Sequence, residues 1–222
     1  MESISNIKDI FNNTPENKLQ MFIEQYKDDS RQGVANLVKR AAKKIDDYNK
    51  EIERTYKLSE FERKYSDYEF ICGIDEVGRG PLAGPVVAGA VILPKDCDIL
   101  YINDSKKLSA KKREELYEVI MEKAVCAKTA VVSPKVIDEI NILQATYEAM
   151  RQAISMLEPQ PTLLLNDAVN IPGVPMKQVS IIKGDAKSIS IGAASIIAKV
   201  TRDAMMVEYD KIYPEYDFAS NK

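Results

Sequence analysis

In the first part of the chain, apolar residues recur three and four positions apart, with charged residues between them. From Val34 to Phe61 this spacing predicts one long amphipathic helix. Thr14-Pro15 is typical of an N-cap followed by proline at the first helical position, so another helix is expected after it. Residues 1–65 are therefore predicted to be an all-helical N-terminal extension, with a docking or packing role rather than a catalytic one.

The pattern changes after residue 65, where short runs rich in β-branched residues alternate with helical spacing. The predicted strands are Glu69–Asp75, Val86–Leu93, Ala127–Val132, Leu163–Leu165 and Val179–Ile182. The predicted helices begin near Ser109, Pro134 and Ala186, and the last two run to Leu157 and to about Asp210. Strands that alternate with helices after an initial hairpin indicate an α/β domain over residues 66–222, with a mixed sheet.

Composition places the chain among ordinary globular proteins, since 45% of its 222 residues are hydrophobic and 29% are charged. The longest nearly apolar run, Pro81–Pro94, is shorter than the ~20 residues that a membrane span needs. The N-terminus lacks the basic flank and apolar segment of a secretory signal, so no membrane association and a cytoplasmic location are predicted. The 3 widely spaced cysteines favour reduced thiols over disulfides or a zinc site.

The chain contains no histidine, which removes the commonest general base and the commonest ligand of transition metals. Catalysis would therefore depend on other side chains, carboxylates among them, and a bound metal would be a hard cation such as Mg²⁺ or Mn²⁺. The net charge of −3 is not that of a simple electrostatic binder of nucleic acids. Any nucleic-acid binding would need a local basic patch.

Two adjacent carboxylates, Asp75 and Glu76, end the first predicted strand and precede Gly78-Arg79-Gly80. In a regular strand the two would face opposite sides of the sheet, so both reach one metal only if the chain turns between them. The glycines permit that turn and let a ligand approach the backbone closely. A glycine-rich turn with two solvated acids explains the segment equally well.

Two further acids follow apolar segments. Asp167 ends the predicted strand at Leu163–Leu165, where an aspartate is more often a turn former than a ligand. Asp203 lies on the last predicted helix, on a face within an arc of about 80° at 100° per residue. This polar stripe comprises Ser188, Gly192, Ser195, Lys199 and Asp203. On a largely apolar helix the stripe favours a site, although a buried hydrogen-bond network also explains it.

Basic residues occur before two of the predicted helices, in Ser105-Lys106-Lys107 and at Lys183 and Lys187. Lysines at such positions are usually surface residues. Together with the amides of a helix N-terminus they would also contact phosphates.

Three of these segments closely resemble bacterial ribonuclease HII. They are Gly73-Ile-Asp-Glu-Val-Gly-Arg-Gly-Pro-Leu-Ala-Gly-Pro85, Asn103-Asp-Ser-Lys-Lys-Leu108, and Lys183-Gly-Asp through Ala194-Ser-Ile-Ile-Ala-Lys-Val-Thr-Arg-Asp203. The resemblance runs from about residue 65 to the end of the chain and extends to the N-terminal helices. It implies a ribonuclease H-like mixed sheet flanked by helices. The implied activity is an endonuclease that cuts the RNA strand of RNA/DNA hybrids and incises at ribonucleotides embedded in duplex DNA.

The resemblance also implies roles for individual residues. Asp75, Glu76, Asp167 and Asp203 would be the catalytic and metal-binding acids and would hold two Mn²⁺ or Mg²⁺ ions. Gly78, Arg79 and Gly80 would read the ribose 2′-hydroxyl, largely through backbone groups. The other substrate-binding residues would be Ser105, Lys106, Lys107, Lys183, Ser188 and Lys199. Cleavage would leave a 3′-hydroxyl and a 5′-phosphate.

The sequence departs from the family pattern in a few places. Asn166 stands where the family usually has an apolar residue, and Ala204 where a long side chain is common. The family normally continues for a few tens of residues beyond the position of Lys222, beginning with a Gly-Tyr motif whose tyrosine stacks at the junction ribose. The catalytic domain is therefore expected to be C-terminally incomplete, and the alternative to an active enzyme is a weakened or inactive hybrid-binding fragment.

Overall fold

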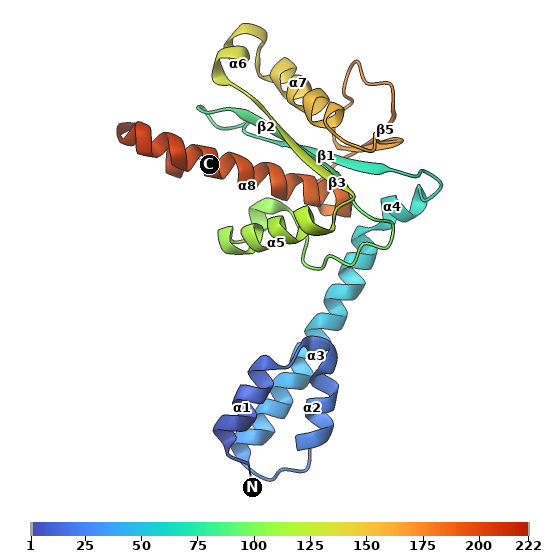
Figure 1. Ribbon diagram of the computed structural model, residues 1–222, viewed down its shortest axis with the longest axis vertical. Coiled ribbons are helices and arrows are strands. Elements are labelled where there is room, and N and C mark those ends of the chain that lie inside the picture. The colour runs from blue at the N-terminus through green and yellow to red at the C-terminus, as the bar shows by residue number, and fades with distance from the viewer. Residues whose placement is uncertain (1, 222) are drawn as a thin grey trace. The chain divides into compact units, whose positions relative to one another are not determined.

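The computed structural model describes residues 2–221 and divides into two compact units, one ending at Arg54 and the other beginning at Thr55 (Figure 1). The first unit contains α1 (Ile4–Asn13), α2 (Leu19–Tyr26) and most of α3 (Gln32–Leu58). Their apolar faces share one core, formed by Ile7, Phe11, Leu19, Phe22, Tyr26, Val34, Leu37 and Ala41. The helical character expected of the N-terminal part is confirmed, whereas the domain boundary at residue 65 stays a prediction.

The helix predicted from Val34 to Phe61 is interrupted near its end. The α3 helix stops at Leu58, and a short helix, α4, covers Glu60–Lys64. Ser59, between them, donates its hydroxyl to the carbonyl of Thr55 at 2.9 Å. A serine that bonds the preceding turn in this way competes with the backbone ladder and favours a helix end.

The second unit is built on a five-stranded sheet with strand order β3-β2-β1-β4-β5. Its strands are β1 (Ile71–Val77), β2 (Val86–Ile92), β3 (Cys126–Val132), β4 (Leu163–Asp167) and β5 (Lys177–Ile181). The first two form the expected hairpin, and β2 pairs with β3 antiparallel as well. On its other side β1 pairs with β4 in parallel, and β4 pairs with β5 in parallel. The sheet is mixed, as predicted.

Helices cover both faces of this sheet (Figure 1). On one face lie α6 (Pro134–Ile140) and α7 (Ile142–Ser155), and on the other α5 (Ala110–Lys123) and α8 (Ile189–Ile212). Apolar residues of β1 and β2 pack against α7 in one core, and Val91 of β2 packs against α5 and α8 in the other. Short 3₁₀ turns lie at Glu16–Lys18, Ser105–Lys107, Gly184–Ala186, Pro214–Tyr216 and Phe218–Ser220.

One helix boundary differs from the prediction. The spacing indicated a single helix from Pro134 to Leu157, but the chain breaks at Asn141, whose φ of +66° lies in the left-handed region. The Asn141 side chain accepts hydrogen bonds from the amides of Leu143 and Gln144, and so caps α7. Asparagine tolerates this conformation and is a strong N-cap, which explains why the helix restarts here.

Two glycines let α8 approach the sheet closely. A Cβ atom at Gly73 of β1 would lie 2.0 Å from the carbonyl carbon of Ser190, and one at Gly89 of β2 would lie 2.3 Å from the carbonyl oxygen of Ala194. Real Cβ atoms do not come so close to backbone, so both positions require glycine. The close packing sets α8 against β1, the strand that carries Asp75. Within residues 2–221, no helix is long and apolar enough to cross a membrane.

Candidate active site

Two acids lie at the same edge of the sheet because β1 and β4 run in parallel. Ile74 is in register with Asn166, so Asp75 and Asp167 follow as neighbours on adjacent strands. Ligand sites of open α/β sheets form at the carboxyl ends of such strands. The two aspartates therefore define the expected position of a site.

Asp75 is nearly enclosed, with 8% of its surface exposed. Burial, followed by the nearby charges of Glu76 and Asp167, raises the pKa of Asp75 well above its ordinary value, and a hydrogen bond with Ser195 opposes this shift. The Ser195 hydroxyl also bonds that of Ser105 at 2.9 Å. The buried carboxyl is thus held by a serine pair that joins α8 to the 3₁₀ turn at Ser105–Lys107.

Glu76 is reached by a cation from the loop that follows β1. Arg79 Nη1 lies 3.5 Å from Glu76 Oε1, and the Arg79 side chain is exposed enough to contact a further group. Burial raises the pKa of Glu76, while Arg79 partly offsets the shift. Between Glu76 and Arg79 the chain turns at Gly78, whose φ of +94° favours glycine. The turn therefore follows the two acids. Asp75 and Glu76 both lie within β1, so the chain does not turn between them as the sequence analysis required.

A fourth acid, Asp185, lies beside Asp167. The backbone N–H of Gly184 donates to Asp167 Oδ1 at 2.7 Å, which fixes the 3₁₀ turn at Gly184–Ala186 against the end of β4. Burial raises the pKa of Asp185, and the charges of Asp104 and Asp167 raise it further. Asp185 was not predicted from the sequence as an acid of the site, although the Lys183-Gly-Asp motif that contains it is part of the family resemblance.

Together these groups line one pocket of about 370 Å³. Its acids are Asp75, Glu76, Asp167 and Asp185, and its lining also includes Gly78, Arg79, Gly80, Ser105, Lys106, Ser195, Lys199 and Arg202. The all-carboxylate donor set fits a hard divalent cation, whose positive charge would offset the burial and the repulsion between acids that raise the pKa values of Asp75, Glu76 and Asp185. Across residues 2–221, no three acidic, thiol or imidazole groups are already gathered closely enough to hold an ion.

The structure does not bring Asp203 to this pocket. Asp203 instead accepts from Lys199 Nζ at 2.7 Å and from Arg113 Nη2 at 3.4 Å, in a hollow between α5 and α8. It lies eight residues beyond Ser195, about 12 Å further along the helix axis at 1.5 Å per residue. Asp203 therefore belongs to the helical stripe, but its carboxylate pairs with these two cations and does not line the pocket.

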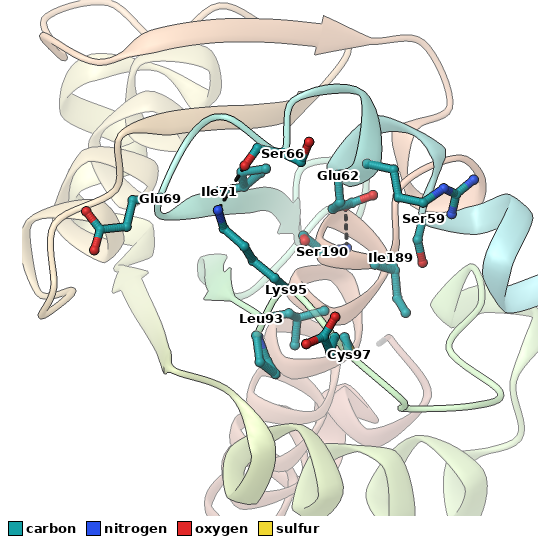
Figure 2. Close-up of a pocket in the computed structure, with 13 residues that line it drawn as sticks. Ser59, Glu62, Ser66, Glu69, Ile71, Leu93, Lys95, Cys97, Ile189 and Ser190 are labelled. Atoms are coloured by element: carbon teal, nitrogen blue, oxygen red, sulfur yellow. Dashed lines mark hydrogen bonds between the residues drawn. The ribbon is translucent and has the colours of Figure 1, made fainter.

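Ser188 also lies away from the acids. It is fully buried and caps α8, and its hydroxyl donates to Glu62 Oε1 at 2.5 Å. The same oxygen accepts from the amide of Ser190 at 3.0 Å, and Figure 2 shows this bond. Because its hydroxyl is engaged inside the protein, Ser188 has no free group for a substrate.

Glu62 and Ser190 line a second pocket of about 320 Å³, drawn in Figure 2. Its lining includes Ile71, at the start of β1, and Leu93, just after β2. The pocket is therefore at the opposite end of β1 from Asp75. Its bonds hold the beginning of α8 and do not belong to the acid site.

The predicted basic residues are divided between the pocket and its surroundings. Lys106 and Lys199 line the acid pocket, whereas Lys107 and Lys183 do not and are exposed. Lys183 is in the left-handed conformation, with φ of +58°, directly before the turn that contains Asp185. The pocket therefore has the exposed Lys106 and the largely buried Lys199 in its lining, and two of its acids, Asp75 and Asp167, near the carboxyl ends of neighbouring strands.

The mixed sheet and the acids at the ends of its neighbouring parallel strands define a ribonuclease H-like protein. The solved ribonuclease H2 from Pyrococcus horikoshii OT3 is similar in fold, with a TM-score of 0.58 and 30% sequence identity over 66% of this chain and 78% of that one. The family model described as Ribonuclease HII matches residues 72–222, and that of the Ribonuclease HII N-terminal domain matches residues 3–66. The chain belongs to the ribonuclease HII family.

Proteins named Ribonuclease HII are similar over most of their length. That of Lachnoclostridium phytofermentans is 63% identical over 199 residues, which are 90% of this chain and 78% of the relative. That of Clostridioides difficile is 50% identical over 223 residues, covering 100% of this chain and 88% of the relative. The resemblance seen in the sequence motifs is confirmed, and with it an endoribonuclease of the ribonuclease H type that acts on RNA/DNA hybrids.

Proposed function

We propose that the chain is a divalent-cation-dependent endonuclease that cuts the RNA strand of hybrids and also incises duplex DNA at an embedded ribonucleotide. Its products would carry a 3′-hydroxyl and a 5′-phosphate. The observation that carries this proposal is the shared pocket of Asp75, Glu76, Asp167 and Asp185, next to the Gly78-Arg79-Gly80 loop, in which Arg79 and Gly80 are exposed. Asp185 takes the place that the sequence analysis gave to Asp203.

The four carboxylates would hold the cations, two Mg²⁺ or Mn²⁺ ions. When bound, such ions supply a nucleophile at neutral pH and stabilise the charge that develops on phosphate oxygens. The chain itself contributes the placement of the acids. Asp75 is fixed by its buried position and by Ser195, and Asp167 by the amide of Gly184.

Recognition of ribose would come from the loop after Glu76. The 2′-hydroxyl both donates and accepts a hydrogen bond, and it alone distinguishes an embedded ribonucleotide from its neighbours. A Cβ atom at Gly80 would have nothing within 4 Å, so the backbone there is open to a ligand. Arg79 bonds Glu76 at one nitrogen and has further donors for a phosphate.

The lysines would bind the phosphates that flank the cleaved bond. Lys106 and Lys199 line the pocket, and exposed Lys107 and Lys183 extend the positive charge beyond it. Ser105 contributes through its bond with Ser195. These local basic residues would allow phosphate binding although the net charge of the whole chain is negative.

The test is incision of a labelled DNA duplex that holds one ribonucleotide, with Mg²⁺ or Mn²⁺. An all-DNA duplex of the same sequence is the control, and end analysis with a phosphatase and a ligase identifies the termini. We expect cutting of the first duplex alone, loss of cutting with EDTA, and loss in Asp75→Asn. Cutting of the all-DNA duplex, or activity that survives EDTA, would contradict the proposal. Binding without incision would favour the fragment alternative.

A further inference from the structure

Arg202 on α8 is fully buried, yet among residues 2–221 its hydrogen bonds go to backbone carbonyls and not to a carboxylate. Its Nε donates to the carbonyl of Pro85 at 3.0 Å and its Nη2 to that of Ala83 at 2.9 Å, while Nη1 donates to that of Asn221 at 3.4 Å. The next residue, Asp203, pairs with Lys199 and Arg113 instead. A buried cation that is satisfied by backbone carbonyls is unusual and ties its helix to those particular segments.

The same guanidinium touches both left-handed glycines of the loop between β1 and β2. A Cβ atom at Gly78, where φ is +94°, would lie 2.6 Å from Arg202 Nε. One at Gly84, where φ is +93°, would lie 2.6 Å from Met206 Sδ and 3.1 Å from Arg202 Nη2. Both positions favour glycine for their backbone conformation and for their close packing against α8. Arg202 is bonded to the end of the loop, at Ala83 and Pro85, and packs closely against its beginning at Gly78.

The residues between these two points face the acid pocket. Arg79, Gly80 and Pro81 line it, and all three are exposed. Arg202 lines the same pocket from its buried side. The loop is thus open where a substrate would lie, while the helix holds it from behind.

We propose that Arg202 is a positioning residue that fixes the backbone of residues 78–84 and thereby sets the selectivity for ribose over deoxyribose. This inference rests on the proposed function, in which that loop reads the 2′-hydroxyl. Backbone groups distinguish one oxygen atom only if they are held in place before the substrate arrives, because a mobile loop adapts to either sugar. Bonds from a guanidinium to two nearby carbonyls supply that restraint, and a lysine ammonium lacks the planar fork to reproduce them.

The experiment compares binding of two duplexes, one all-DNA and one with a single ribonucleotide. It uses the full chain with Asp75→Asn to prevent turnover, in Mg²⁺, and fluorescence anisotropy gives the ratio of the two Kd values. The variants added to this background are Arg202→Lys, Arg202→Met and Gly84→Ala. Arg151→Lys is the matched control, since Arg151 likewise donates to a backbone carbonyl, that of Pro172, but on α7.

We expect the preference for the ribonucleotide duplex to fall by about tenfold in the Arg202 and Gly84 variants, the size of effect that loss of charged hydrogen bonds produces. Arg151→Lys should keep the preference. A merely structural role would lower stability without changing a ratio of two affinities. If Arg202→Met fails to fold, Arg202→Lys and Gly84→Ala decide, because both keep the buried cation.

Two failures are distinguishable. Equal binding of both duplexes by the Asp75→Asn background, together with no incision at the ribonucleotide by the unsubstituted chain, overturns the proposed function. A clear preference that folded Arg202→Lys and Gly84→Ala retain unchanged overturns the role of Arg202 and leaves the proposed function in place.

Discussion

The backbone N–H of Gly184 donates a 2.7 Å hydrogen bond to Oδ1 of Asp167. This bond holds the turn before α8 against the end of β4, so that the next residue, Asp185, lines the same pocket as Asp167. A Cβ atom at Gly184 would lie 2.6 Å from Ile191 Cδ1, so the turn packs tightly on the helix as well. One short segment therefore joins a strand end, an acid and the start of a helix.

Asp185→Asn is expected to reduce incision at a ribonucleotide by at least about 100-fold, while the protein remains folded. The amide keeps the shape of the side chain but removes the charge that a divalent cation requires. Single-turnover kinetics at saturating Mg²⁺, with circular dichroism as a check on folding, measure both effects. Activity close to that of the unsubstituted chain would show that Asp185 is not one of the essential acids.

Asp203→Asn is the matched control for that experiment. Asp203 is paired with Lys199 and Arg113 outside the pocket, so its loss should reduce incision by less than about tenfold, mostly through the freedom gained by Lys199. A loss as large as that of Asp185→Asn would restore Asp203 to the acids of the site.

The crowded acids should destabilise the cation-free protein near neutral pH. Burial, ahead of the charge of Glu76, raises the pKa of Asp75, and burial also raises the pKa values of Glu76 and Asp185. A carboxyl with a raised pKa gives stability that is complete below its unfolded pKa and is lost as pH rises through its folded pKa. In EDTA, the free energy of unfolding should therefore decrease as pH rises from about 4 toward these raised values.

Asp75→Asn removes the most deeply buried of these charges. In EDTA near neutral pH its Tm should exceed that of the unsubstituted chain by about 2 to 4 °C, the effect of ~1 kcal/mol in a domain of this size. The difference should shrink as the pH falls to about 4 and below, where Asp75 is protonated in both the folded and the unfolded state. Thermal unfolding followed by circular dichroism across this pH range measures the difference in Tm. Parallel curves of Tm against pH for the two proteins would contradict a raised pKa of Asp75 as the cause.

Gly73→Ala should lower the free energy of unfolding by at least about 2 to 3 kcal/mol, since its Cβ would meet the backbone of α8 and force the helix from the sheet. Gly80→Ala is the control, because a Cβ there has nothing within 4 Å, and its effect on stability should stay within about 0.5 kcal/mol. Urea unfolding gives both values. Equal stability of the two variants would mean that α8 moves away from β1 without cost and so accommodates the added Cβ at residue 73.

Glu62→Gln should lower stability by about 1 to 2 kcal/mol, because Glu62 accepts from both Ser188 and Ser190 at the start of α8. Glu69→Gln changes an exposed acid that lines the same pocket and should have little effect. Chemical denaturation of the pair isolates the contribution of the cap. Equal losses would assign the effect to overall charge instead.

The strands and the main helices of the second unit could be predicted from the sequence because their hydrophobic runs are strong. The grouping of Asp75, Glu76 and Asp167 came from the family resemblance, and the parallel pairing of β1 with β4 supplies the physical reason that Asp75 and Asp167 are neighbours. Asp185 could not be found by periodicity, because it lies in a 3₁₀ turn that follows a left-handed residue, Lys183. Only the hydrogen bond between Gly184 and Asp167 shows where that turn lies.

The polar residues of the α8 stripe differ in where their side chains lie. Ser195 and Lys199 line the pocket, whereas Asp203 pairs with Lys199 and Arg113. Distance along the axis does not explain the difference, because Arg202, one residue before Asp203, lines the pocket from a position about 100° away around the helix. Arg202 lies only about 20° from Ser195 around the helix and lines the pocket, yet a search for acids and small polar residues passes over an arginine.

Ser195, Lys199 and Arg202 come from one uninterrupted helix, at steps of four and three residues. Removing one residue from α8 before Ser195 would rotate everything after it by about 100° and withdraw all three side chains together. The helix is therefore far less tolerant of insertions and deletions than of substitutions. Length changes in descendants of this chain should accumulate in connecting loops and leave the span from Gly192 to Arg202 intact.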